Sequence, residues 1–211
     1  MIIAIDGPAA SGKGTLARRL AAHFDFAHLD TGSIYRAVGL KVLRQNGGPT
    51  DRRDAVSAAR AVSSADLDDS VLRSDEAADA ASKVAAIPEV RDALLDFQRN
   101  FATHPPGGKA GAVLDGRDIG TVVCPDAEVK LFVTASLETR ADRRHKELRQ
   151  RGVEAIHSAV LRDMQDRDAR DRERDAAPLM PADDAFVLNT TELDADAAFE
   201  AALDFIKSRT G

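Results

Sequence analysis

The chain of 211 residues is poor in cysteine, in aromatic residues and in long apolar segments. Its single cysteine, Cys124, excludes an intrachain disulfide and favours a reducing compartment, so we expect the cytoplasm. No uncharged apolar run approaches the ~20 residues that a membrane-spanning helix needs. The apolar start, Met1–Ile5, has no basic segment before it and is followed directly by Asp6, which is not the pattern of a signal peptide.

Lysine is also scarce. The chain has 7 lysines against 22 arginines and 35 acidic residues, and its formal net charge is −6. An acidic protein of this size is a poor candidate for a sequence-independent nucleic-acid binder, so we expect no nucleic-acid partner. Ten of the arginines lie between Arg140 and Arg174, and the positive charge is therefore local. Arginine carries a planar fork of donors that matches phosphate and carboxylate groups.

Five short apolar segments predict buried strands, and segments with helical spacing separate them. The strands are expected at 2–5, before Asp30, at 112–114, at 129–133 and at 186–188. Helices are expected over 16–24, after Thr31, over 88–101, 137–151, 154–174 and 195–206. Buried strands that alternate with helices indicate an α/β domain, with a five-stranded parallel sheet covered by helices on both faces.

The chain is expected to form a single domain, 1–211, that comprises a core, an insert and a lid. Residues 1–49 and 104–211 would form the core. The segment 50–103 would be an insert that begins with short helices and no confident strand, and 143–158 would form a lid. The histidines show no spacing of metal ligands, so we expect no histidine-bound metal.

The segment after the first predicted strand has the form of a phosphate-binding loop. It reads Gly7-Pro8-Ala9-Ala10-Ser11-Gly12-Lys13-Gly14-Thr15. Glycines let backbone N–H groups turn toward phosphate oxygens, and the loop leads into a helix N-terminus with its positive dipole end. Lys13 would reach the β- and γ-phosphates of a nucleotide. A plain glycine-rich turn is the alternative, and the strand–loop–helix context together with the lysine favours the phosphate loop.

The strict form of this motif has serine or threonine directly after the lysine, where this chain has Gly14 and then Thr15. We therefore expect Thr15 to contact phosphate. Mg²⁺ would be bound mainly by phosphates and water, without a direct protein ligand. Asp30 and Asp115, which end the second and third predicted strands, could orient the metal-bound water.

Arginine-containing motifs follow the same two strands: Leu29-Asp30-Thr31-Gly32-Ser33-Ile34-Tyr35-Arg36 and Leu114-Asp115-Gly116-Arg117-Asp118-Ile119-Gly120-Thr121. In parallel α/β sheets, ligands bind at the carboxyl ends of the strands. Arg36 and Arg117 would therefore bind a second anionic group opposite ATP. The alternative is that these arginines lie on the surface or cap helices.

A third arginine motif runs from Arg167 to Arg174 in a predicted helix. Arg167, Asp171 and Arg174 are spaced i, i+4 and i+7, on one face, so the two arginines could hold the Asp171 carboxylate ionised. A solvated face with ion pairs is the commoner meaning of such a run, and it stays open here. A GTP-dependent switch is not favoured, because no asparagine is followed by lysine.

These blocks together resemble the bacterial cytidylate kinase family, nucleoside monophosphate kinases that phosphorylate CMP and dCMP. They span Ile5 to Leu179 in the expected order, and adenylate kinases lack the Asp-Gly-Arg-Asp and Arg-Asp-x-x-Arg blocks in this form. The resemblance implies a three-layer P-loop kinase fold. It also implies transfer of the ATP γ-phosphoryl group to CMP or dCMP, with Mg²⁺ as cofactor. We expect a monomer, with these nucleotides as its partners and no membrane partner.

The resemblance also assigns residues. Gly7 through Thr15 would bind ATP, and Lys13, Arg117 and Arg174 would be catalytic. The residues on the CMP side would be Thr31, Tyr35, Arg36, Ser82, Arg91, Arg117, Asp118, Arg167, Asp171 and Arg174. Ser82, Arg91 and Asp118 match positions that read cytosine. Arg167, Asp171 and Arg174 would hold the sugar and the phosphates.

The insert departs from the family, which usually has a small antiparallel sheet before the Ser82 region, whereas this insert is short and poor in strands. Cys124 stands where an aromatic residue is common, and we interpret it as a small buried side chain. Arg143, Arg144, Arg149 or Arg151 would close over the transferring group as part of the lid.

Two other functions remain possible on the residues alone. A kinase of another monophosphate or of a hydroxylated metabolite is the first, and a hydroxyl acceptor could use Asp30 or Asp118 as a general base. The second is a non-catalytic module that binds nucleotide or RNA through the arginine-rich segment 140–174.

Overall fold

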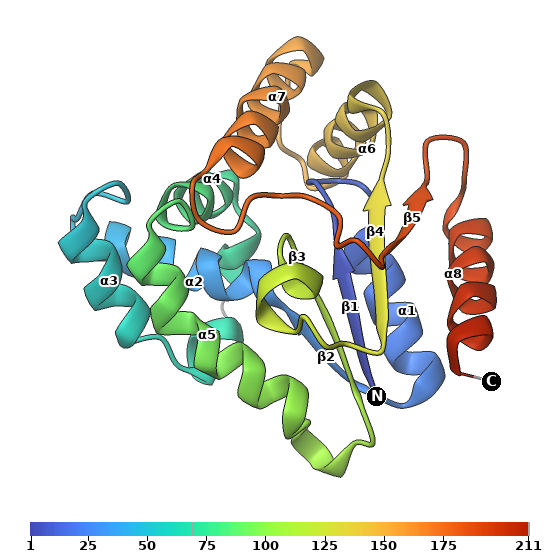
Figure 1. Ribbon diagram of the computed structural model, residues 1–211. Helices are drawn as coiled ribbons and strands as arrows, with labels where there is room; N and C mark the ends of the chain where they lie inside the picture. Colours follow the sequence, from blue (N-terminus) through green and yellow to red (C-terminus); the bar gives the residue numbers. More distant parts are fainter. Residues whose placement is uncertain (69, 211) are drawn as a thin grey trace.

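A five-stranded parallel sheet forms the centre of the computed structural model, which describes residues 1–68 and 70–210 (Figure 1). The strands are Ile2–Asp6 (β1), Ala27–Asp30 (β2), Ala112–Gly116 (β3), Val129–Thr134 (β4) and Phe186–Asn189 (β5). Their order in the sheet is β2-β3-β1-β4-β5, and all four neighbouring pairs are parallel. The carboxyl ends of all five strands therefore lie at one edge, and the predicted sheet is confirmed.

Alternation along the strands divides the apolar residues between two layers of helices. Ile3 and Ile5 of β1 pack into the layer formed with α1 (Lys13–Phe24) and α8 (Ala195–Thr210). Ala4, between them, faces the opposite layer. Successive side chains of a strand point to opposite faces, so a strand covered on both faces is apolar throughout. This is the reason that the central strands β1, β3 and β4 could be predicted as continuous apolar runs.

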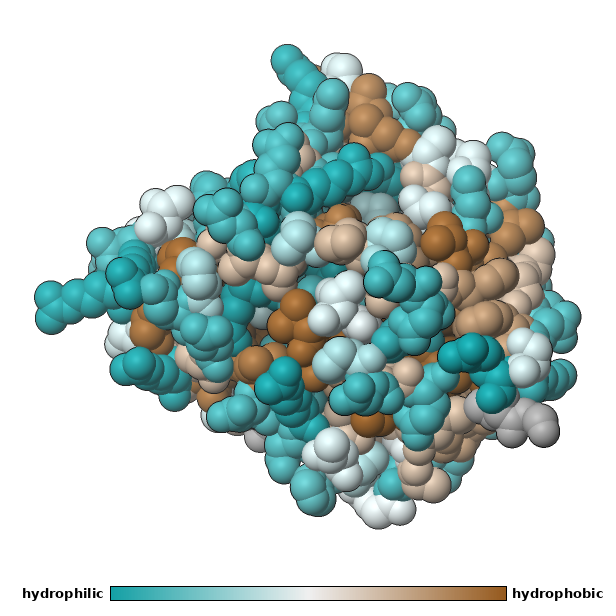
Figure 2. Space-filling model, viewed as in Figure 1, coloured by the Kyte–Doolittle hydropathy of each residue, from teal (hydrophilic) through white to brown (hydrophobic). Residues whose placement is uncertain are grey.

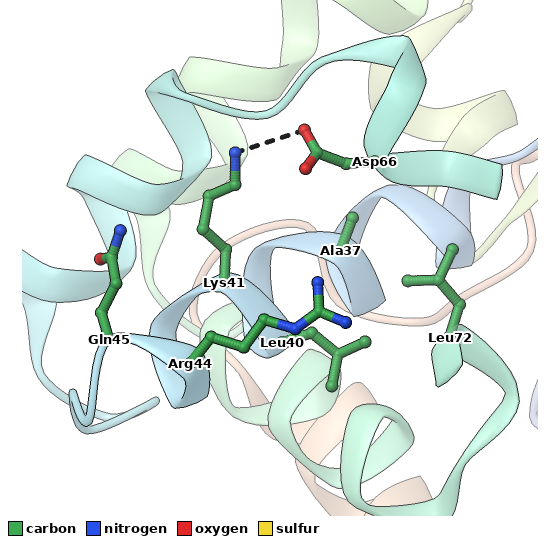
Figure 3. A pocket seen from close by; sticks show the side chains of 7 residues that line it. All are labelled: Ala37, Leu40, Lys41, Arg44, Gln45, Asp66 and Leu72. Atoms are coloured by element: carbon green, nitrogen blue, oxygen red, sulfur yellow. Dashed lines mark hydrogen bonds and ion pairs between the residues drawn. The ribbon is translucent and has the colours of Figure 1, made fainter. Parts of the chain in front are cut away.

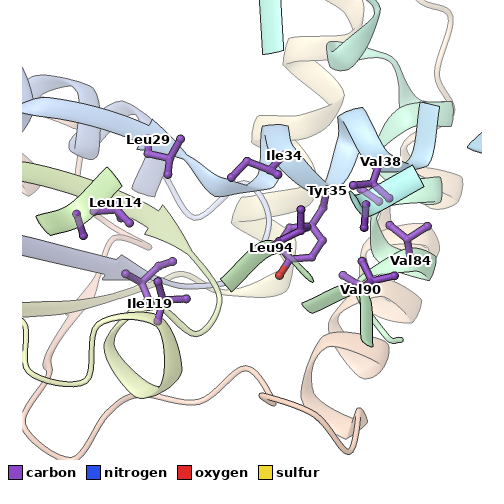
Figure 4. Close-up of a cluster of buried hydrophobic side chains, with 14 of the residues drawn as sticks. Leu29, Ile34, Tyr35, Val38, Val84, Val90, Leu94, Leu114 and Ile119 are labelled. Atoms are coloured by element: carbon purple, nitrogen blue, oxygen red, sulfur yellow. The ribbon is translucent and has the colours of Figure 1, made fainter. Parts of the chain in front are cut away.

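The opposite layer contains α2 (Thr31–Arg44) and α5 (Pro88–Thr103) (Figure 4). Ile34 and Val38 of α2 and Leu94 of α5 belong to the apolar cluster that this layer forms with the sheet, and each is at most 2% exposed. Burial of one such side chain contributes roughly 1.5–3 kcal/mol. Pro88 occupies the start of α5, where its missing N–H costs nothing.

The insert contains helices only, among the residues that are described there. They are α3 (Arg52–Arg60), the short 3₁₀ turns η1 (Ser64–Asp68) and η2 (Ser70–Arg73), α4 (Asp75–Val84) and α5, which also covers the sheet. The expected scarcity of strands is thus confirmed for this part of the chain. Gly39 lets α4 lie directly against α2, because a Cβ atom on Gly39 would come 2.7 Å from the Cβ atom of Ala80.

A helical hairpin, α6 (Leu137–Gln150) and α7 (His157–Glu173), stands above the carboxyl edge of the sheet (Figure 1). Both helices were predicted. However, α7 begins at His157 rather than at residue 154, and it ends before Arg174. The chain also forms η3 (Pro106–Gly108) and a π-helical turn, η4 (Ile119–Val123), after β3. None of the helices in the described ranges is long and apolar enough to cross a membrane.

Substitution Gly39→Ala should lower the free energy of unfolding by about 1–3 kcal/mol, because the new methyl group has no room between α2 and α4. Chemical denaturation followed by circular dichroism measures the change. Gly48→Ala is the control: its nearest neighbour would be Asp51 Cβ at 3.6 Å, an ordinary contact. Equal stability of the two variants would show that the close approach of the helices is not needed.

Candidate functional site: a charged cleft at the phosphate loop

The phosphate loop joins β1 to α1 and has the backbone that its sequence predicts. A side chain on Gly7 would place its Cβ atom 2.0 Å from the carbonyl oxygen of Val133. Ala10 and Gly12 have positive φ values of 57° and 93°. No side chain caps the N-terminus of α1. The N–H group of Thr15 donates to the carbonyl oxygen of Gly12, so the N–H groups that precede it in this turn are the ones available to an anion.

Lys13 is the first residue of α1, and its side chain is half-buried. Nζ donates to the carbonyl oxygen of Pro8 at 3.4 Å. Burial, and then the nearby Arg117, lower the pKa of Lys13 to about 7, although Asp115 and Asp30 act in the opposite direction. A lysine whose charge is this poorly compensated is well suited to bind a phosphate group.

A cleft opens beside Lys13, at the carboxyl edge of the sheet, and it collects every residue predicted for the CMP side. Hydrophilic side chains cover most of the surface over α6 and α7, although a hydrophobic patch lies among them near the top of the view (Figure 2). The residues that line the cleft are Lys13, Asp30, Thr31, Gly32, Tyr35, Arg36, Ala81, Ser82, Ala85, Arg91, Asp115, Gly116, Arg117, Asp118, Arg167, Asp171 and Arg174. They come from α1, β2, α2, α4, α5, β3 and α7 and from the turns that follow the strands.

Three ion pairs neutralise part of the positive charge in the cleft. Arg36 Nη2 lies 2.5 Å from Asp30 Oδ2, and Arg117 Nε lies 2.9 Å from Asp171 Oδ2. Arg91 pairs with Asp118, and both are almost fully buried. With six basic and four acidic side chains, the lining carries a formal charge of +2, in a chain whose net charge is −6.

The arginines of the cleft have hydrogen-bond donors to spare. Arg167 Nε, Arg174 Nη2 and Arg36 Nε are buried and have no partner in the described structure. Burial, and then Arg117, lower the pKa of Arg167 to about 10. Buried donors are almost always paired in proteins, so three unpaired guanidinium nitrogens in one cleft indicate an anionic ligand.

The far end of the cleft offers neutral and charged hydrogen-bonding groups together. Ser82 Oγ is buried without a partner. Arg91 donates to the carbonyl oxygen of Ala85 at 3.2 Å, and its guanidinium carbon lies 5.3 Å from the centre of the Tyr35 ring. A flat heterocycle with acceptors and donors on one edge would meet matching groups here.

Asp6, which the sequence analysis did not single out as a site residue, fixes the turn that carries Arg117 and Asp118. Its two carboxyl oxygens accept hydrogen bonds from the N–H groups of Ile119 and Gly120, each at 2.8 Å. Burial raises the pKa of Asp6 to about 7. The sequence signal was its position at the end of β1, but its partners lie 113 and 114 residues away.

The partners of Asp171 differ from the expectation. Its carboxylate pairs with Arg117 of the turn after β3, and not with Arg167 or Arg174. Those two arginines lower the pKa of Asp171 through their charge alone. Arg174 lies beyond the end of α7, in an extended conformation, and its Nε donates to Ala177. The predicted helical face therefore holds for Arg167 and Asp171 only, although Arg174 still reaches the cleft.

The lid arginines do not line the cleft in the described structure. Arg143 donates to the carbonyl oxygens of Thr190 and Leu193, at 2.6 and 3.3 Å. Arg144 pairs with Asp75 and Glu147, Arg151 pairs with Glu147, and Arg149 is exposed. Arg144–Asp75, together with Arg170–Asp79, instead connects the hairpin to α4 of the insert.

Two carboxylates near the phosphate loop could support a hydrated Mg²⁺ ion. Asp115 Oδ1 lies 2.8 Å from His28 Nε2, while its Oδ2 faces Gly14 of the loop. Asp30 acts on Lys13 through its charge. Carboxylate oxygens are suitable partners for the water shell of Mg²⁺. No group of three histidine, cysteine or acidic side chains that could hold a metal ion directly occurs in the described ranges.

A second hollow lies beside α2, where Lys41 and Asp66 face each other (Figure 3). Lys41 Nζ donates to Asp66 at 3.3 Å and to the carbonyl oxygen of Ala61 at 2.7 Å. None of the buried, unpartnered side-chain atoms found in the described residues belongs to its lining. The charged cleft at the phosphate loop is therefore the stronger candidate for a ligand site.

Comparison with known proteins identifies the family of the chain. The family model described as cytidylate kinase matches residues 3–208. A cytidylate kinase of Paramagnetospirillum magneticum is 66% identical over 208 residues, which cover 99% of this chain and 98% of that protein. A cytidylate kinase of Rhodospirillum rubrum is 60% identical over 210 residues, with 100% and 99% coverage.

Among solved structures, the fold resembles that of TT1252 from Thermus thermophilus, with a TM-score of 0.50 and 20% identity over 100% of this chain and 98% of that one. An uncharacterized protein from Eubacterium ventriosum has a TM-score of 0.56 and 16% identity, with 99% coverage of both chains. These similarities concern the fold alone. The match of the family model to almost the whole chain, with relatives at 60% identity or more, is decisive: this chain belongs to the cytidylate kinase family.

Proposed function

We propose that the charged cleft holds CMP or dCMP opposite an ATP molecule bound by the phosphate loop. As a member of its family, the chain is an ATP-dependent kinase that converts CMP or dCMP to the diphosphate. One observation above all supports this use of the cleft: unpaired buried donors of Arg36, Arg167 and Arg174 gather beside Lys13. Two anionic groups that must meet need such a concentration of positive charge.

On the donor side, the backbone of Gly7 through Thr15 would surround the phosphates of ATP. The open N-terminus of α1 adds its dipole, and Lys13 adds a full charge to the β- and γ-phosphates. Thr15 would contact phosphate through its hydroxyl, which in this structure accepts a hydrogen bond from Arg18. Positioning and charge compensation are the main tasks of a protein in phosphoryl transfer.

On the acceptor side, four arginines would bind the phosphates, namely Arg36, Arg117, Arg167 and Arg174. Asp171 would accept a hydrogen bond from a sugar hydroxyl, because an ionised carboxylate only accepts. Burial opposes the ionisation of Asp171, but Arg117 and Arg167 lower its pKa, so the carboxylate is charged near neutral pH. Ser82, Arg91 and Asp118 would contact cytosine, with Tyr35 and Thr31 closing that end of the cleft.

The reaction needs no general base, since the acceptor phosphate is already largely ionised at neutral pH. The attacking oxygen would be held in line with the γ-phosphorus by the arginines, and Lys13 would stabilise the charge that develops on the transferred group. Mg²⁺ bound to ATP would supply further charge compensation. Asp30 and Asp115 would orient its water ligands. A monomeric state and a location in the cytoplasm stay predictions.

A release assay for ADP, coupled to a spectroscopic readout, tests the function with a panel of acceptors. CMP and dCMP should give turnover well above UMP, AMP and GMP. Turnover with hydroxylated metabolites but not with monophosphates would favour the other class of kinase. Salt-dependent RNA binding without ADP release would favour the non-catalytic module.

Lys13→Met should reduce kcat by about 10²–10³-fold, because a positive charge at the transferred group is lost. Proton uptake on ATP binding distinguishes a role of Lys13 in nucleotide binding from a purely structural role. Its pKa of about 7 means that it is mostly neutral at pH 8, and a bound polyphosphate would raise that pKa. ATP binding at pH 8 should therefore take up ~1 proton in the wild type.

Isothermal titration calorimetry in two buffers with different ionisation enthalpies measures this uptake. The Lys13→Met variant, which has no ammonium group, should lack the component that Lys13 contributes. Equal proton uptake in both proteins would show that Lys13 is not the group that responds to the nucleotide.

Ser82→Ala should lower kcat/KM for CMP and leave the KM for ATP unchanged. The buried Ser82 hydroxyl lines the cleft and has no protein partner, so its loss would leave a polar group of the base unpaired. The expected cost is about 1–3 kcal/mol, or roughly 5- to 150-fold. Thr121→Val is the matched control, since Thr121 Oγ1 is also unpartnered but does not line the cleft. Similar kinetics of the two variants would remove Ser82 from the base site.

A further inference from the structure

A buried ion pair that lies outside the cleft connects the helical hairpin to the phosphate loop. Arg140 of α6 and Asp168 of α7 are 3% and 6% exposed. Nη2 of Arg140 donates to Oδ2 of Asp168 at 2.6 Å, and Nη1 donates to Oδ1 at 3.2 Å. This side-by-side arrangement restricts both the distance and the rotation between the helices.

The same guanidinium group reaches two further segments. Arg140 Nε donates to the carbonyl oxygen of Ala135, in the turn after β4, at 3.0 Å. Arg140 Nη1 lies 3.3 Å from the carbonyl oxygen of Ala9, inside the phosphate loop. A single side chain thus holds the loop, the turn after β4 and α7 in fixed relation.

Asp168 stands next to Arg167 and one helical turn before Asp171 in α7. Arg167 and Asp171 line the cleft, whereas Asp168 is directed to the Arg140 side. Because side chains on a helix turn together, the pair Arg140–Asp168 sets the direction in which Arg167 and Asp171 point. It therefore sets the position of the acceptor groups relative to the donor loop.

Stability alone does not account for this pair. Its neighbourhood is a small apolar cluster in which Ala9 and Ala10 of the loop pack against Ala141, Val160 and Met164 of the hairpin. Burying two charges carries a desolvation cost, and pairs of this kind can often be replaced by apolar side chains without loss of stability. What apolar side chains cannot replace is the hydrogen bond to Ala9 and the fixed rotation of α7.

We propose that Arg140 and Asp168 are positioning residues for phosphoryl transfer, which align the phosphate loop with the acceptor groups of α7. The proposal rests on the proposed use of the loop for ATP and of the cleft for the acceptor. Loss of the pair should slow the chemical step more than it weakens binding of either substrate. A displacement of about 1 Å between reacting groups can cost 10²-fold in rate.

The first test replaces the whole pair, in the double variant Arg140→Met with Asp168→Leu. Its thermal unfolding should stay close to that of the wild type, because no buried charge is left unpaired. We expect kcat to fall by about 10–100-fold, with KM for ATP and for CMP changed by less than about threefold. The matched control is a variant without the surface pair Arg19–Asp196, in which Arg19 Nη1 lies 2.8 Å from Asp196 Oδ1. This variant should have the wild-type kcat.

The second variant, Arg140→Lys, keeps the buried charge but has no planar fork to reach Asp168, Ala135 and Ala9 together. It should show a smaller fall in kcat with the same separation from KM. Wild-type kcat in either the folded double variant or Arg140→Lys would overturn the proposal. So would a double variant that fails to fold, since the pair would then serve stability. Absence of CMP turnover in the wild type would instead contradict the proposed function.

Discussion

The concentration of positive charge inside the protein is the constraint on which the rest of this structure depends. Six basic side chains line one cleft, and like charges at close range repel one another strongly in a buried site. Burial is the main reason that the pKa values of Lys13 and Arg167 are lowered, and repulsion from the neighbouring Arg117 adds to both shifts. The fold must therefore hold these groups together against their own electrostatics. Packing and hydrogen bonds hold the charged groups in place.

Carboxylates hold most of these groups in place, some from inside the cleft and one from outside it. Inside the cleft, Asp30 and Asp171 pair with Arg36 and Arg117, so that the arginines are oriented before a phosphate arrives. Outside it, Asp6 holds the turn after β3. Preorganised donors need little rearrangement during the reaction, which is why electrostatic stabilisation in a protein can exceed that in water.

Local pattern predicted the strands, and contiguous motifs predicted the phosphate loop and the arginines at the strand ends. Ser82 and Arg91 were placed at the cleft only by the resemblance to the family. Gly7 to Lys13 can be interpreted without knowledge of the fold, and the carboxyl edge of a parallel sheet brings Arg36 and Arg117 to the same place. The partners of these groups were not predictable in the same way. Asp171 is helical and three residues from Arg174, yet α7 ends between them, and its ion pair is with Arg117, 54 residues earlier.

The pairing of the lid arginines shows the same limit and has a structural consequence. One of Arg143, Arg144, Arg149 and Arg151 is expected to close over the transferred group, which stays a prediction. In this structure Arg143 donates to the carbonyl oxygen of Thr190 in the turn after β5, and Arg144 pairs with Asp75 of the insert. With Arg170–Asp79, the second of these contacts joins the hairpin to α4 of the insert. Exposed pairs of this kind are each worth little, about 0–1 kcal/mol. The two pairs therefore stabilise the placement of the hairpin against α4 only weakly.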